Sequence, residues 1–183
     1  MLSFDDATNR LRTYGSEDLS KLFMDLEFSA AGVEPWPATF LQIILALLGD
    51  RTFLQLQDSW RLIYFINNAW ELLTGEQRDR LRRPLEDAFE EYRDWMGAFI
   101  TAEVLGEKYG DREALAALSR LGRTAKAPAR ALAPHGLEAV ARESPNQELR
   151  DLAISELREL KDPENDEVKR EAVLSLNNLG IEK

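Results

Sequence analysis

The chain has 183 residues, of which 44% are hydrophobic and 31% charged. This composition is typical of a globular protein with a sizeable core and excludes a disordered chain. Residues 1–110 carry 19 acidic and 11 basic side chains, so most of the net charge of −10 lies there. This charge either serves mainly to keep the protein soluble or favours a basic partner over nucleic acid or anionic membrane. The absence of cysteine excludes disulfides, thiolate chemistry and the commonest structural zinc ligands.

The sequence predicts no membrane span. The longest apolar run, "FLQIILALLG" at 40–49, is much shorter than the roughly 20 residues that cross a bilayer. The first ten residues carry acids where a secretory signal would have a basic region. We therefore expect a soluble, cytoplasmic protein.

The N-terminal part, residues 1–110, contains all four tryptophans and has a helical pattern without a clean repeat. We expect Ser16 to cap a first helix and Pro37 to start the next one. A long helix is expected over 53–75, with Gly75 closing it. Its apolar stripe comprises Leu56, Trp60, Ile63, Ile66 and Trp70.

Residues 76–110 are expected to form one long helix or two, with Pro84 starting a new helix or kinking a continuous one. The apolar stripe of this segment comprises Leu85, Phe89, Tyr92, Met96 and Phe99. Five acids lie beside it, and this acidic run comprises Glu86, Asp87, Glu90, Glu91 and Asp94. No segment has the period of a β-strand.

A repeat occupies residues 111–183. Nearly the same ten letters occur twice, as "EALAALSRLG" at 113–122 and "EAVLSLNNLG" at 171–180, and two further copies lie between them. Each copy has an alanine with apolar residues four and seven positions later, which places all three on one face of a helix. The four copies are Ala114/Leu118/Leu121, Ala133/Leu137/Val140, Ala153/Leu157/Leu160 and Ala172/Leu176/Leu179. One helix per 19 or 20 residues gives a helix pair about every 39 residues.

That period resembles the HEAT-repeat α-solenoids. The segments "ELRDLAISELRELK" and "EVKREAVLSLNNLG" resemble the second helices of HEAT pairs. The resemblance implies an all-α fold of HEAT-like helical repeats, an α-α superhelix, over 111–183. Residues 1–110 are then either diverged helix pairs or a helical bundle that caps the solenoid. We expect 1–183 to form one helical domain without a linker.

Residues that end or cap helices lie between the repeat helices, as a helical repeat requires. Pro163 in "KDPEND" ends one helix, and Asp166 is placed to cap the next. Asn146 is a second candidate cap. Gly122 and Gly180 stand where helix C-termini favour glycine.

Few residues suggest chemistry. The single histidine, His135, is a candidate base, but "PHG" also reads as a helix start at which the imidazole contacts backbone. Glu103 is an acid among apolar residues, which is the setting that raises a carboxyl pKa. The tryptophans are either core residues or the lining of a ligand pocket. No phosphate-binding loop, nucleophile elbow or His-based zinc signature occurs, so we expect no cofactor and no metal.

The acidic run is either a solvated helix face or a docking surface for a basic partner. Metal binding is the weaker alternative, because carboxylate metal sites on helices usually include Glu-x-x-His. The cluster Arg78, Arg80, Arg82 and Arg83 precedes the acids, and a helix-surface salt network is favoured there over phosphate binding.

These features predict a non-enzymatic protein-binding module that uses a helical surface to hold a basic partner. In size, acidity and helical repeats the chain resembles small acidic bacterial immunity proteins, which implies neutralisation of a cognate basic toxin. A scaffold or regulatory adaptor of a cytoplasmic complex is the alternative. An enzyme of the HEAT-like glycosylase or lyase type is the second alternative.

Overall fold

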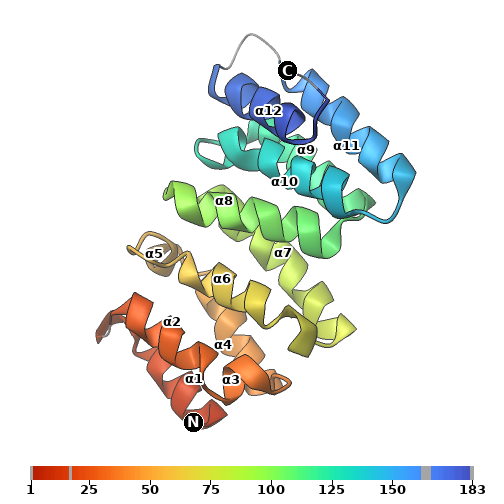
Figure 1. Ribbon diagram of the computed structural model, residues 1–183. Helices are drawn as coiled ribbons and strands as arrows, with labels where there is room; N and C mark the ends of the chain where they lie inside the picture. Colours follow the sequence, from red (N-terminus) through yellow and green to blue (C-terminus); the bar gives the residue numbers. More distant parts are fainter. Residues whose placement is uncertain (1, 17, 162–165, 182–183) are drawn as a thin grey trace. The chain divides into compact units, whose positions relative to one another are not determined.

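The computed structural model describes residues 2–16, 18–161 and 166–181, which are all-helical and contain no strand (Figure 1). The first helices are α1 Phe4–Arg12, η1 Tyr14–Ser16, α2 Leu19–Glu27, α3 Ala30–Val33, α4 Ala38–Leu48, α5 Arg51–Leu54, α6 Arg61–Asn68 and η2 Trp70–Leu72. The remaining helices are α7 Gly75–Glu91, α8 Trp95–Val104, the π-helical turn η3 Leu105–Tyr109, α9 Arg112–Thr124, α10 Ala129–Glu143, α11 Gln147–Glu159 and α12 Asp166–Asn178. Among the described residues, no helix is both long and apolar enough to cross a membrane.

The chain divides into two compact units, residues 1–88 and 89–183. Residues 89–110, which the sequence groups with the N-terminal part, therefore pack with the C-terminal repeats. The expectation of one domain stays a prediction.

The core of the first unit is aromatic. The Trp36 ring stacks on Phe65 at a centroid distance of 5.5 Å and meets the edge of Phe40 at 5.2 Å. Its indole N–H donates to the carbonyl of Ala31 at 2.7 Å, so the ring is buried without leaving its polar atom unpaired.

The long helix expected over 53–75 is interrupted. α5 ends at Leu54 and α6 begins at Arg61, and between them Asp58 takes a left-handed conformation with φ of 65°. The Ser20 hydroxyl donates to the Asp58 carboxylate at 3.0 Å and ties this turn to α2. Gly75 does not close a helix but opens α7, where Thr74 and Gln77 form reciprocal capping bonds.

Residues 76–110 form two helices, but the break falls at residues 92–94 rather than at Pro84, which lies inside α7. Asp94 begins α8 by accepting a hydrogen bond from the Gly97 amide at 2.8 Å. Tyr92 stays buried, and its ring lies where a side chain on Gly97 would be. The expected apolar stripe is therefore split, and Met96 and Phe99 are exposed by 50% and 36%.

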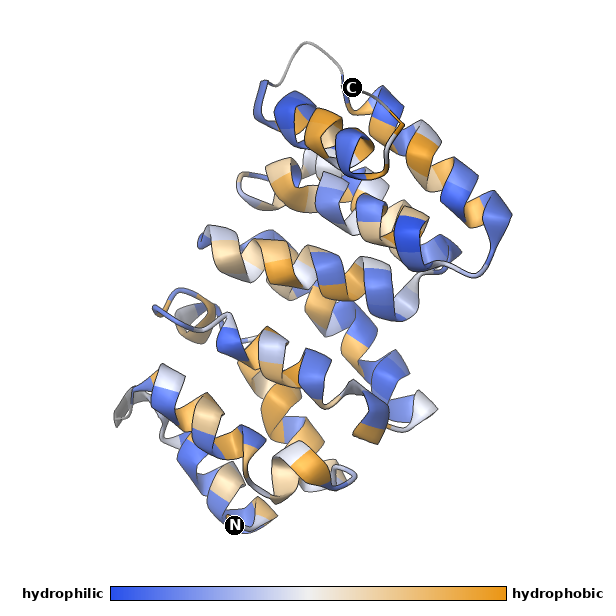
Figure 2. Cartoon of the chain, viewed as in Figure 1, coloured by the Kyte–Doolittle hydropathy of each residue, from blue (hydrophilic) through white to orange (hydrophobic). Residues whose placement is uncertain are grey.

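The four sequence repeats are the four consecutive helices α9 to α12, which confirms one helix per repeat. Their alanines are all buried, with at most 1% exposure. Figure 2 shows both hydrophilic and hydrophobic residues along α11 and along α12. The segments at α11 and α12 both resemble second helices of HEAT pairs, but consecutive helices cannot both hold that position.

Helices two apart in the second unit are joined by polar contacts of a constant spacing. Arg112–Glu148 and Arg123–Glu159 connect α9 to α11, and His135–Glu171 connects α10 to α12. Each pair spans 36 residues. Figure 1 shows α8, α10 and α12 lying one above another, and α10 packs against both of its neighbours in that layer.

The helix boundaries confirm some of the expected caps. The Asn146 side chain accepts from the Glu148 amide at 2.9 Å. Gly180 has φ of 72°, and the Ile181 amide donates to the carbonyl of Leu176, which is the Schellman arrangement. Pro37 precedes α4 directly and serves as its N-cap residue.

Other caps are wrong. Asp18 rather than Ser16 caps α2, because its carboxylate reaches the Lys21 amide at 3.2 Å. Asp166 is the first residue of α12 rather than its cap, and Pro163 lies outside the described residues. Gly122 lies within α9, where a Cβ would be 3.0 Å from Leu160 Cδ1.

Two glycines let α8 and η3 approach α10 closely. A Cβ on Gly106 would lie 2.1 Å from the carbonyl oxygen of Gly136, and a Cβ on Gly136 would lie 2.7 Å from the carbonyl oxygen of Ala102 on α8. Backbone contact at this crossing leaves no room for a side chain. It brings the polar residues of α8 and α10 together.

Candidate functional site

The acidic run does not form one uniform surface. Glu86 is only 9% exposed and pairs with Arg83 at 3.2 Å, and Asp87 pairs with the same guanidinium at 3.0 Å. Glu90 is exposed and Glu91 half-buried. Asp94 serves as the cap of α8. The outward carboxylates of this run are therefore chiefly Asp87 and Glu90.

The basic cluster next to it is partly engaged inside the fold. Arg78 donates to the carbonyl of Trp70 at 2.9 Å, pairs with Glu71 and lies over the Trp70 ring. Arg83 bridges Glu86 and Asp87 as described. These contacts agree with a helix-surface salt network.

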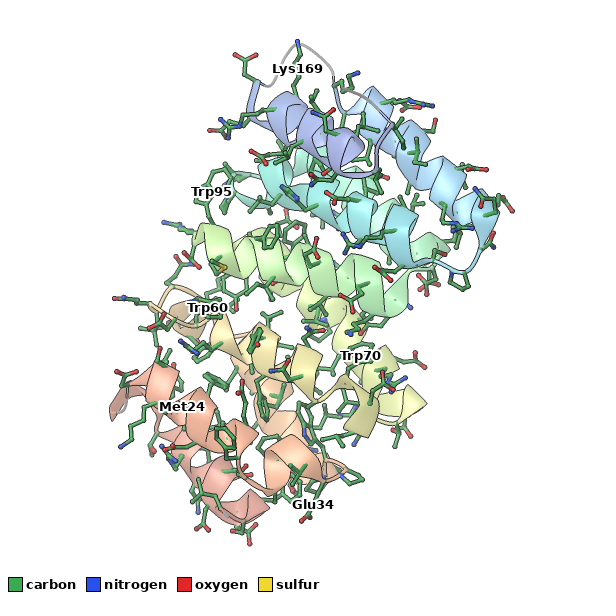
Figure 3. All side chains as sticks on the ribbon, viewed as in Figure 1. Met24, Glu34, Trp60, Trp70, Trp95 and Lys169 are labelled. Atoms are coloured by element: carbon green, nitrogen blue, oxygen red, sulfur yellow. The ribbon has the colours of Figure 1, made fainter. Side chains whose placement is uncertain are left out.

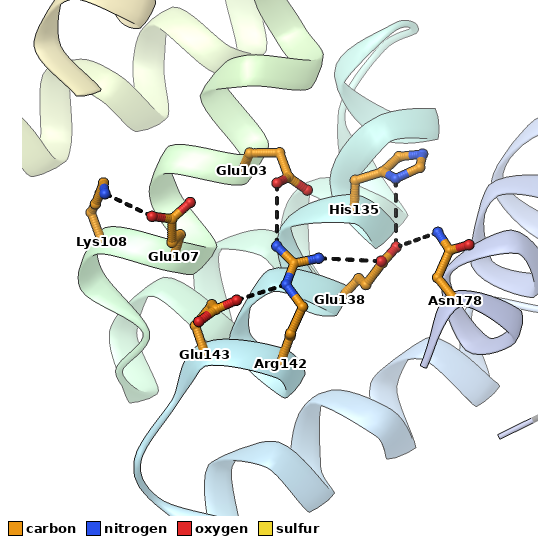
Figure 4. A network of polar contacts seen from close by, with 8 residues as sticks. All are labelled: Glu103, Glu107, Lys108, His135, Glu138, Arg142, Glu143 and Asn178. Carbon is orange, nitrogen blue, oxygen red and sulfur yellow. Dashed lines mark hydrogen bonds and ion pairs between the residues drawn. The ribbon is translucent and has the colours of Figure 1, made fainter. Parts of the chain in front are cut away.

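The second unit holds a polar network that sequence patterns alone do not reveal (Figure 4). Its centre is Arg142 on α10, whose guanidinium contacts Glu143 at 2.7 Å, Glu138 at 3.4 Å and Glu103 on α8 at 3.6 Å. Glu138 also accepts from the amide of Asn178 on α12 at 3.2 Å. One cation thus stands among three carboxylates and links neighbouring helices.

His135 extends this network toward α12. Its side chain is 9% exposed, its Nε2 lies 3.0 Å from Glu171 and its Nδ1 lies 3.8 Å from Glu138. The ring of Phe99 meets it edge-on at 5.0 Å. His135 therefore lies in the middle of α10 between two carboxylates, which corrects the expectation of a helix start with backbone contacts.

Glu103 has the perturbed acidity that its sequence setting predicts. Burial raises the pKa of its carboxyl, Glu138 and Glu107 act in the same direction, and Arg142 and His135 oppose the rise. The Arg142 guanidinium stays charged, because its hydrogen bond to Glu143 raises an already high pKa. The network therefore holds three carboxylates, those of Glu103, Glu138 and Glu143, around the one guanidinium of Arg142.

The sequence contains only a partial signal for this network. The 39-residue helix-pair period matches His135 with Leu174, and Glu171 lies three residues, about one helical turn, before that position. The side-chain directions that bring Arg142 to Glu103 have no such signal. Among the described residues, no cluster of three or more histidine, cysteine or carboxylate side chains is arranged to hold a metal ion.

The tryptophans divide between core and surface (Figure 3). Trp36 and Trp70 are buried in the first unit, with 3% and 4% exposure. Trp60 is half-buried beneath the Arg61 guanidinium, and Trp95 in the second unit is 45% exposed. Trp36 and Trp70 are therefore core residues rather than the lining of an open pocket.

Comparison of the chain with family models, curated proteins and solved structures finds no match.

Proposed function

We propose that this chain is a non-enzymatic protein-binding module with HEAT-like helical repeats and that its partner is a basic protein. The observation that carries the proposal is the exposure of Asp87 and Glu90 on α7 in a chain of net charge −10. Charge of this kind accelerates encounter with a basic surface and contributes specificity.

The repeat architecture supports the same function. Consecutive helices of constant spacing hold surface residues at fixed intervals, which suits recognition of an extended protein surface. Polar contacts between α9 and α11 and between α10 and α12 recur at a 36-residue separation, three residues short of the 39-residue helix-pair period, and this recurrence supports a two-helix repeat.

In its more specific form, the proposal is that the chain acts as an immunity protein, masking the substrate-binding surface of a basic bacterial toxin. The acidic run Glu86, Asp87, Glu90, Glu91 and Asp94 is the proposed contact. Within it Asp87 and Glu90 would meet the partner directly, whereas Glu86 and Asp94 also support the helices.

The experiment is partner capture with the tagged chain from its native host, at low and then moderate salt, followed by mass spectrometry. We expect one small basic protein that dissociates as salt rises, because screening weakens exposed charge contacts. Larger housekeeping proteins would favour the adaptor instead. Absence of any partner at both salt concentrations would contradict the proposal.

Charge reversal locates the contact. The double variant Asp87→Lys/Glu90→Lys should lower partner affinity at least tenfold without unfolding the chain, because both side chains are exposed. A control of equal charge change, Asp79→Lys/Asp151→Lys, places the lysines at other exposed positions and should have a much smaller effect. Equal losses of partner affinity in the two double variants would show that the acidic run is not the contact surface.

An enzyme that uses Glu103 as a general acid is the second candidate. The raised pKa of this carboxyl favours it. Arg142, 3.6 Å away, works against it because a neighbouring cation favours the ionised form. The binding function is better supported.

A further inference from the structure

The first unit exposes large apolar side chains along two helices that pack against each other, α2 and α6. On α2, Met24 is 51% exposed, and Phe28 at its C-terminal end is 77% exposed. Tyr64 on α6 is 41% exposed. Met24 is labelled in Figure 3, as is Trp60, whose ring meets Tyr64 edge-on at 6.3 Å. Single exposed apolar residues are common, but these share one pair of helices.

Two hydrogen bonds fix the register of α2 against α6. Ser20 donates to Asp58 at 3.0 Å just before α6, and Asn68 at the end of α6 donates to Glu27 at 3.4 Å. The first bond joins the start of α2 to the turn before α6, and the second joins the C-terminal ends of the two helices. The helices therefore run in the same direction along this seam. Met24 and Tyr64 lie between the two bonds in sequence.

A carboxylate stands at each end of the seam. Asp58 accepts from the Ser20 hydroxyl and from the Trp60 indole N–H at 3.2 Å, and Glu27 accepts from the Asn68 amide. These hydroxyl, indole and amide donors are neutral, and they orient the carboxylates. Ser20 and Glu27 are seven residues apart on α2, so the two charges stand about 10 Å apart along the helix.

A hollow of about 230 Å³ opens beside Phe28 at the Glu27 end of the seam. Its lining includes the buried Phe65 and Ala69 together with Gly32. The volume is below the usual range for small-molecule sites, which begins at about 300 Å³, and suits one bulky apolar side chain.

From these observations we infer that the α2–α6 surface, which comprises Met24, Glu27, Phe28, Asp58 and Tyr64, docks an amphipathic helix of a basic protein partner. Two lysines or arginines about two turns apart on that helix meet Asp58 and Glu27. An apolar side chain near the second basic residue enters the hollow beside Phe28. The inference rests on the proposed function and gives it a second contact region, distinct from the acidic run.

Like-charge repulsion argues against a second copy of this chain as the occupant of the α2–α6 surface. In a symmetric contact each patch would face itself, so Glu27 and Asp58 would meet carboxylates of the same seam. With a net charge of −10 on each copy, that arrangement is repulsive. A basic segment would instead be attracted to Glu27 and Asp58.

The test is amide NMR of the full chain titrated with a synthetic helical peptide of about 18 residues, long enough to form a helix. The peptide carries arginines at positions i and i+7 with leucine at i+4, and a control peptide replaces both arginines by glutamate. We expect shift changes centred on Met24, Phe28 and Tyr64 with the arginine peptide and none with the control.

Substitutions then separate the contributions of the charged and the apolar side chains to peptide binding. Glu27→Gln retains the oxygen that accepts from Asn68 and removes the charge, and Asp58→Asn removes the charge and keeps one of the two acceptor oxygens. Each should weaken peptide binding roughly threefold. Phe28→Ser should weaken it roughly tenfold. Leu174→Ser, at an apolar position that is 45% exposed in the second unit, should leave binding unchanged.

Other results would overturn the inference. Shift changes centred on α7, together with loss of binding in Asp87→Asn/Glu90→Gln, would reject the α2–α6 surface but leave the proposed function standing. Absence of shifts at about 1 mM peptide would also reject this surface. Partner capture by the full chain tests the proposed function separately.

Discussion

Substitution of Gly106 by alanine tests the helix crossing on which the polar network depends. The added Cβ would lie 2.1 Å from the carbonyl oxygen of Gly136 and 2.8 Å from the Cβ of Ala139. Ordinary van der Waals contact requires more than 3 Å, so η3 and α10 would have to separate by about 1 Å. Because backbone lies on one side of the clash, no side-chain rotation can relieve it.

The expected cost follows from two opposing effects. Overpacking of a tight contact costs typically 1–3 kcal/mol, and this contact lies at the severe end. Alanine in place of glycine inside a helix returns about 0.5–1 kcal/mol. We therefore expect Gly106→Ala to lower the free energy of unfolding by about 2 kcal/mol.

Urea unfolding followed by circular dichroism measures this change. Gly75→Ala at the start of α7 is the matched control, because nothing lies within 4 Å of the position of its Cβ. Its stability should change by less than about 0.5 kcal/mol. If Gly106→Ala is as stable as the parent chain or more stable, the close backbone crossing is refuted.

Two further predictions concern carboxylates in the second unit. Glu103 has a raised pKa in the folded chain, so the folded state binds more protons than the unfolded state and loses stability as pH rises above the ordinary glutamate value of about 4.3. Glu103→Gln should flatten that fall in urea titrations over pH 4 to 8, and an unchanged slope would show that Glu103 titrates normally. Asp94→Ala removes the α8 cap and should cost about 1 kcal/mol in thermal or urea unfolding, whereas Asp87→Ala should cost about 0.5 kcal/mol or less. Equal effects would contradict the capping role.

Local patterns were sufficient to predict helices and some of their ends. The spacing of Ala114, Leu118 and Leu121 identifies a buried face because residues four and seven apart lie on the same side of any α-helix. Asn146 and Gly180 were recognisable for a similar reason, since their capping bonds involve neighbours within a few residues.

The positions at which long helical patterns break were not predictable in this way. Apolar periodicity continues through residues 55–60 and 92–94, yet the chain turns at both. The first turn is held by Ser20, which lies 38 residues before Asp58, and at the second Tyr92 stays in the core. The role of Gly122 was not predictable either. A glycine near a helix end looks the same in sequence whether it terminates the helix or leaves room for a side chain of another helix, here Leu160.

By itself, then, the sequence determined that the chain is all-helical, acidic and repeated in its C-terminal part, since these depend on composition and on spacing within one helix. Tertiary structure alone decided that Glu86 is buried while Asp87 is exposed, and that Glu103, Arg142 and His135 share one network. It also decided that Phe28 is left uncovered beside a hollow. Whether a helix face is buried or free depends on which distant helix packs against it, and that information is not local to the face.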